Sequence, residues 1–120
     1  MNSIKDALDA LCRIDGVNYA SFVDAEGELI EASGDEPEKF MMPGSFVNAL
    51  RMLCEQIDSN YPVESMSQSY IEFEDFNFTC VPIAEYFLCI IANSGVNLGR
   101  VRLEIKKNRK HLEALVSVNE

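Results

Sequence analysis

The stretch NFTCVPIAEYFLCIIA, residues 77–92, decides the fold, because it contains two apolar segments separated by only two residues. Both segments are rich in residues that favour β-strands, and a two-residue connection is typical of a β-hairpin. A turn at Ala84 and Glu85 would place Cys80 directly opposite Cys89. The second segment is almost wholly apolar, which indicates a central strand that is covered on both faces.

A third strand is expected directly before this hairpin, in SQSYIEFED at residues 67–75. A two-residue turn at Asp75 and Phe76 would place Phe73 opposite Phe78. In this register one face of the three strands is strongly apolar and the other is mixed. We therefore expect helices to cover both faces of the sheet.

The first third of the chain predicts a helix and a second hairpin. Residues 3–13 carry apolar side chains at helical spacing, with Ser3 as the N-cap. Strands are expected at 17–23 and 28–33, joined by the turn DAEG at 24–27. The second of these strands is the more polar, which indicates a position at the edge of the sheet.

Two further helices complete the pattern. One is expected from Ser45 to about residue 59, and its apolar face consists of Phe46, Leu50, Leu53 and Ile57. The last helix begins at Asn97, a suitable N-cap. The predicted order is helix, strand, strand, helix, strand, strand, strand, helix. This order predicts a single α+β domain over residues 1–120, with helices arranged around an antiparallel sheet.

The charge distribution is uneven, and it bears on possible partners. The chain has a net charge of −10, yet six of its ten basic residues lie in NLGRVRLEIKKNRK, residues 97–110. An acidic protein repels nucleic acid and anionic membrane surfaces. The basic residues are also interrupted by Glu104 and do not all fall on one face of the helix. We therefore expect no nucleic-acid partner, and we interpret this segment as a solvated helix face or a contact for an acidic partner.

Motifs for catalysis, cofactors and metal ions are absent from the sequence. His111 is the sole histidine, no C-x-x-C pair occurs, and no phosphate-binding loop or nucleophile elbow is found. The acids of the 24–31 hairpin lack the spacing of a calcium loop. We expect no enzyme activity, no cofactor and no metal site. Because no apolar run reaches the length of a membrane span and the N-terminus has no secretory pattern, we expect a cytoplasmic protein without membrane insertion.

Cys80 and Cys89 allow two interpretations. As cross-strand neighbours they are placed for a redox-labile disulfide. A directly opposed pair in a sheet is a strained place for that bond, and the cytoplasm disfavours it. The other interpretation, which we favour, is a pair of small buried hydrophobic side chains.

Two stretches of the sequence resemble the roadblock/dynein-light-chain domain family. IDGVNYASFVDAEGELI, residues 14–30, is similar to the opening hairpin of these domains, with Gly-Val before a short strand and Asp-x-x-Gly before the next. CVPIAEYFLCIIANSGVNLGRVRLEIKKN, residues 80–108, resembles the closing segment. That segment has a strand ending in Pro, a tight turn, a buried strand and an Asn-Leu-Gly-x-x-Arg helix start. We expect a prokaryotic MglB-like member of this family.

The resemblance implies a roadblock/profilin-like sandwich. Its five-stranded antiparallel sheet would have the second helix on one face and the first and last helices on the other. It also implies a homodimer, in which the edge strand pairs with its own copy through Ser67, Gln68, Ser69, Tyr70 and Ile71. The low charge of this segment independently favours pairing. In this arrangement the outward residues of the second helix would be available to bind a partner. They are Val47, Asn48, Arg51, Met52 and Glu55.

The function that the resemblance implies is regulatory. Members of the family serve as scaffolds and regulators of small Ras-like GTPases, or as light chains of motor complexes. We therefore expect a non-catalytic homodimeric scaffold that binds a small Ras-like GTPase, with a GTPase-activating or localisation role. The alternative is an accessory or sensor subunit of a metabolic or redox complex that uses the same fold.

Overall fold

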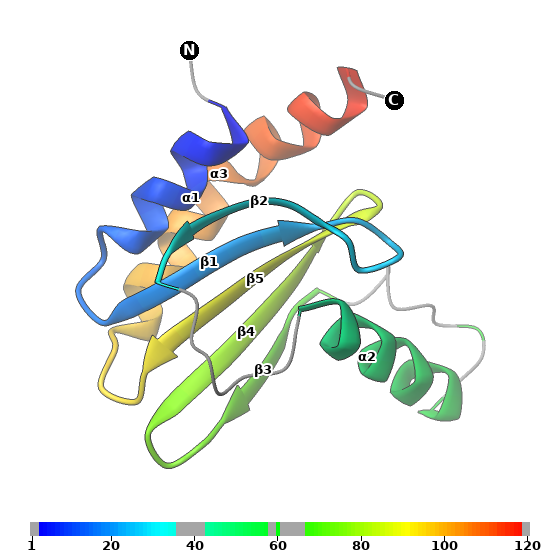
Figure 1. Cartoon of the computed structure of the whole chain (residues 1–120), viewed down its shortest axis with the longest axis horizontal. Helices are drawn as coiled ribbons and strands as arrows, with labels where there is room; N and C mark the ends of the chain where they lie inside the picture. The colour runs from blue at the N-terminus through cyan, green and yellow to red at the C-terminus, as the bar shows by residue number, and fades with distance from the viewer. Residues whose placement is uncertain (1–2, 36–42, 58–59, 61–66, 119–120) are drawn as a thin grey trace.

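The described residues form three helices and five strands in the predicted order (Figure 1). The computed structural model describes residues 3–35, 43–57, 60 and 67–118, with the backbone alone at 43–47, 54, 55 and 118. The elements are α1 (Ile4–Cys12), β1 (Val17–Val23), β2 (Leu29–Gly34), α2 (Pro43–Ile57), β3 (Ser69–Glu72), β4 (Phe76–Ile83), β5 (Tyr86–Asn93) and α3 (Leu98–Val118).

The strands form one antiparallel sheet in the order β2-β1-β5-β4-β3. This order confirms the predicted α+β class and the central place of β5, and it puts β2 and β3 at the two edges. α1 begins and α3 ends at the same end of the molecule, away from β3 and α2 (Figure 1).

Local signals explain where the helices start. The Ser3 hydroxyl accepts a hydrogen bond from the Asp6 amide at 3.1 Å, and the Asp6 carboxylate accepts one from the Ser3 amide at 3.0 Å. These reciprocal bonds satisfy free amides of the first turn of α1. The Asn97 side chain accepts from the Arg100 amide at 3.2 Å and caps α3 in the predicted way. α2 begins at Pro43, two residues before the predicted start, because proline suits the first turn of a helix.

The predicted register of the last hairpin is confirmed, whereas that of β3 is wrong. Cys80 pairs with Cys89 as expected. In contrast, Ile71 pairs with Phe78, so β3 is offset by two residues from the prediction. The reason is the turn, which closes with the Phe73 amide donating to the Phe76 carbonyl at 2.8 Å. The polar Glu74 and Asp75 thus form the turn, and Phe76 becomes part of β4.

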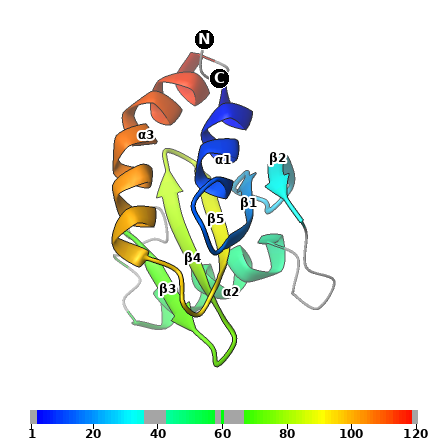
Figure 2. The same cartoon turned by 90° about the vertical axis from the view of Figure 1, so that its left-hand side faces the viewer.

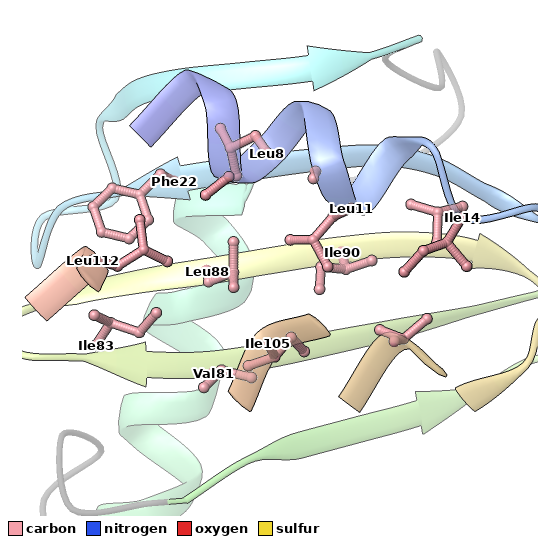
Figure 3. Packing of buried hydrophobic residues seen from close by; sticks show 14 of the residues in the cluster. Leu8, Leu11, Ile14, Phe22, Val81, Ile83, Leu88, Ile90, Ile105 and Leu112 are labelled. Carbon is pink, nitrogen blue, oxygen red and sulfur yellow. The ribbon is translucent and has the colours of Figure 1, made fainter. Parts of the chain in front are cut away.

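An offset of two residues leaves each side chain on its predicted face, because side chains alternate along a strand. One face of the sheet carries the larger core, which α1 and α3 cover (Figures 2 and 3). Figure 3 shows side chains of α1 and α3 meeting those of β1, β4 and β5, among them Leu8, Leu11, Phe22, Val81, Ile83, Leu88, Ile90, Ile105 and Leu112.

The opposite face carries a second, smaller core, to which α2 contributes Leu50. The sheet side of this core consists of Tyr19, Val23, Phe78, Cys80, Phe87, Cys89 and Ile91. The expected distribution of helices over the two faces is therefore confirmed. Among the described helices, none combines the length and the apolar character that a membrane span requires.

The packing of α2 differs from the prediction. Leu53 is 55% exposed and Ile57 is 75% exposed, although both were expected to face the core. Leu50 is buried as expected, and Phe46 lies outside the described side chains. Of these three described positions of the predicted apolar face, only Leu50 thus reaches the sheet, and Leu53 and Ile57 are left in solvent.

Candidate partner-binding surface

Among the described strands, β3 forms one edge of the sheet and is hydrogen-bonded to β4 alone. Of the residues expected at this edge, Ser69, Tyr70 and Ile71 lie in β3 and are half-buried. Gln68, which is half-buried, and Ser67, which is exposed, precede the strand. The structure therefore places three of the five expected residues on an edge strand whose outer side pairs with no other described strand.

The closing bond of the β3–β4 turn determines which backbone groups face outward. Because Phe73 is hydrogen-bonded to Phe76, and bonded pairs alternate along an antiparallel ladder, Ser69 and Ile71 also bond to β4. The amides of Tyr70 and Glu72 must then point to the open edge. These two residues supply the backbone donors and acceptors that another strand would use.

The Tyr70 side chain remains a neutral hydrogen-bonding group at this edge. Its hydroxyl lies 3.5 Å from the Glu72 carboxylate. Desolvation and the negative charge of Glu72 both raise the pKa of the Tyr70 hydroxyl above its ordinary value of 10.0, because they disfavour the phenolate.

The predicted partner-binding residues of α2 divide into two groups. Asn48 is exposed, and the side chain of Met52 is 67% exposed. Arg51 is half-buried, and its guanidinium donates to the Ala25 carbonyl at 3.0 Å, so it holds α2 against the β1–β2 turn. The side chains of Val47 and Glu55 lie outside the described residues.

Leu53 and Ile57 were missed as candidate partner-binding residues. They lie one helical turn apart on the exposed part of α2, and they extend the apolar surface of Met52. Their spacing from Leu50 was correctly read as an apolar helix face. Periodicity identifies such a face, but it does not tell whether the chain's own sheet or another molecule covers it.

The thiols of Cys80 and Cys89 lie 3.9 Å apart on the face of the sheet that α2 covers, and both are free. The hydrogen bond between them, together with burial, raises the pKa of the Cys89 thiol well above its ordinary value of 9.0. A thiol in this state is a poor nucleophile, because the thiolate is the reactive form. This geometry supports the interpretation of two small buried side chains.

The basic residues of α3 fall on two sides of the helix. Arg109 donates to the Pro82 carbonyl at 3.0 Å and pairs with Glu113 at 3.2 Å. Arg100 and Lys107 lie on the opposite side, toward α1. Within the described part of the chain, no cluster of three or more His, Cys, Asp or Glu side chains is arranged to hold a metal ion.

Solved structures share this fold. Myxococcus xanthus MglB is 21% identical, with a TM-score of 0.79 over 96% of this chain and 95% of that chain. An MglB with a tetrameric arrangement is 15% identical, with a TM-score of 0.73 over 96% and 92%. A Roadblock/LC7 domain from Streptomyces avermitilis is 12% identical, with a TM-score of 0.67 over 92% and 98%. No protein-family model matches the sequence, and no curated protein matches it.

Proposed function

We propose, on the premise that this chain has the fold of MglB and of the Roadblock/LC7 domain, that it is a cytoplasmic, non-catalytic regulator that forms a homodimer and binds a small Ras-like GTPase. The observation that carries the proposal is the unpaired edge of β3 together with the exposed apolar side chains of α2. Both features expose groups that proteins usually cover, and both lie away from the end where α1 begins and α3 ends (Figure 1).

Self-association through β3 would extend the sheet into a second copy. The outward amides of Tyr70 and Glu72 would pair with the same strand of the partner, and a two-fold axis would make the contact isologous. Four residues give a short ladder, so burial of Leu53 and Ile57 would have to supply further stabilisation. The MglB with a tetrameric arrangement supports self-association of a chain with this fold.

A proline at position 70 tests the dimer. Tyr70→Pro removes a donor that faces the open edge and leaves the bonds to β4 intact, and proline is tolerated at strand edges. At low protein concentration, we expect light scattering to give twice the 13.5-kDa chain mass for the unmodified chain and the single-chain mass for the variant. Tyr70→Ala is the control for loss of the ring and should remain dimeric. A dimer of Tyr70→Pro at the same low concentration would contradict pairing through β3.

The GTPase contact is assigned to α2. Asn48→Ala and Met52→Ala change exposed side chains without touching the core, so each variant should fold normally. We expect each to weaken binding to a small Ras-like GTPase by about fivefold or more, in the range of interface contacts. Biolayer interferometry against the GDP- and GTP-bound forms measures this, with Lys106→Ala on α3 as the control. Unchanged affinity in both α2 variants would exclude this site.

The alternative of a redox sensor finds less support. Its candidate thiols are buried on the face of the sheet that α2 covers, and the hydrogen bond to Cys80, together with burial, keeps Cys89 protonated. A GTPase also brings its own nucleotide and catalytic groups, which suits a chain without a catalytic motif. A regulator of this kind would act by changing the conformation of the GTPase switch segments.

A further inference from the structure

A groove between α1 and α3 has an electrostatic character opposite to that of the whole chain. It has a volume of about 200 Å³, and Ala10 and Ile14 form the apolar part of its lining together with Leu103. Three cations surround it, Arg13 from the end of α1 and Arg100 and Lys107 from α3, while Glu104 is its one carboxylate. Within the described part of the chain, none of the three cations has a carboxylate at ion-pair distance.

The rim of this groove also carries an exposed apolar side chain, since Leu103 is 64% exposed. A complementary surface should therefore combine carboxylates with aliphatic side chains. A flat anionic membrane would not enter a hollow between two helices, whereas a protruding turn would.

A turn with this composition lies elsewhere on the same chain. Between β1 and β2, Glu26 and Glu28 are exposed, and they are followed by Leu29 and Ile30, which are 50% and 47% exposed. The turn is held in shape because the Asp24 carboxylate accepts hydrogen bonds from the Glu26 and Glu28 amides, both at 2.9 Å. A turn fixed in this way loses little conformational entropy on docking.

The turn and the groove lie at opposite ends of β1, as Figure 1 shows by the positions of α1 and the β1–β2 connection. Seven residues of strand separate them by about 20 Å, so the turn does not reach the groove of its own chain. We infer that the β1–β2 turn of one copy docks into the α1–α3 groove of a second copy.

Such a contact joins two different surfaces, so it adds copies head to tail or, where a two-fold axis brings each turn into the groove of the other copy, closes a dimer. It is separate from the proposed β3 contact and does not depend on it. The net charge of −10 opposes association at long range. At physiological ionic strength, however, charges interact over only about 8 Å, so the close pairs in the groove outweigh that repulsion.

A charge swap tests the contact. The groove variant Arg100→Glu/Lys107→Glu and the turn variant Glu26→Lys/Glu28→Lys are each made together with Tyr70→Pro, so that pairing through β3 is excluded. In sedimentation velocity, the Tyr70→Pro chain should increase in weight-average mass with concentration, and each swap alone should abolish the increase. An equimolar mixture of the two swaps should restore it, because the reversed groove and the reversed turn are again complementary.

The matched control is Lys106→Glu/Lys110→Glu, which changes the net charge of the same helix equally but lies outside the groove. It should associate like the Tyr70→Pro chain. An absence of concentration dependence in the Tyr70→Pro chain, or a mixture of swaps that fails to associate, would overturn the inference. If pairing through β3 is contradicted by its own test, this measurement can still be interpreted, because the two charge-swap variants are compared with each other.

Carbodiimide cross-linking provides a second, direct measurement. The reagent forms an amide only between a carboxylate and an amine in contact, and it should join Lys107 to Glu26 or Glu28. In an equal mixture of ¹⁴N- and ¹⁵N-labelled chains, the linked peptides should contain pairs of mixed isotope. Peptides of one isotope only, or links from Lys106 and Lys110 in place of Lys107, would also overturn the inference.

Discussion

Ala84 adopts a φ of 55° in the two-residue turn between β4 and β5, in the left-handed region where a Cβ atom is unfavourable. Among the described residues, it is the only non-glycine residue with a positive φ. The turn nevertheless forms, because the paired strands on either side are buried and fix the connection. The strain is therefore local, and a single substitution should relieve it.

Ala84→Gly should stabilise the fold by up to about 1 kcal/mol, because relief of the left-handed strain exceeds the entropy that glycine adds to the unfolded chain. Urea denaturation measures the difference. Glu85→Gly, at the neighbouring position without positive φ, is the control and should be neutral or destabilising. A loss of stability in Ala84→Gly would show that the turn is not strained.

Cys89 leads to a prediction about pH. Its pKa is raised in the folded chain, so the folded state holds the proton more tightly than the unfolded state does. The resulting stabilisation is complete below the pKa of the unfolded thiol, and it is lost as the pH rises through and beyond that value toward the folded pKa.

Urea denaturation midpoints should therefore fall between about pH 8 and pH 10, the range in which an unfolded thiol ionises. Cys89→Ala should flatten this fall, and Cys12→Ala, at a thiol that is only partly buried, is the matched control. An unchanged pH profile in Cys89→Ala would mean that other groups cause the fall.

At the scale of the elements, the sequence predicts best where burial and spacing agree. The β4–β5 register was predictable because Ala84 and Glu85 are the one break between two apolar runs. The turn before β4 lies among alternating acids and aromatic residues, EFEDF, where two adjacent positions satisfy the pattern equally well. The rings of Phe73 and Phe76 stack with their centroids 4.5 Å apart, and the sequence pattern does not predict this contact.

α2 allows a direct comparison of a buried with an exposed apolar residue on the same helix. Leu50→Ala removes a buried side chain and should cost about 2–4 kcal/mol, whereas Ile57→Ala should cost less than about 0.5 kcal/mol in the single chain. Both costs are measured by urea denaturation of variants that also carry Tyr70→Pro, so that a β3 dimer does not contribute to stability. Equal costs would show that Ile57 is packed in solution.

At the scale of the whole molecule, the sequence predicted how the helices and the sheet are layered, but it did not predict which apolar side chains are exposed. Alternating apolar strands and three amphipathic helices predicted a sheet with helices on both faces. The partner-binding residues stay a prediction: Asn48 and Met52 are exposed, Arg51 is engaged with Ala25, and the exposed Leu53 and Ile57 were assigned to the core. Exposure depends on how far a helix extends beyond the sheet it packs on, which sequence periodicity does not record.

The common end at which α1 begins and α3 ends has a practical consequence (Figure 1). A fluorescent reporter or an affinity tag fused ahead of α1 or behind α3 would project from the side of the molecule that is remote from β3 and α2. Either fusion should therefore keep both of those surfaces open, and two reporters on one chain would sit near enough for energy transfer. Loss of that transfer would then indicate separation of α1 from α3, and it would provide an optical readout of unfolding in living cells.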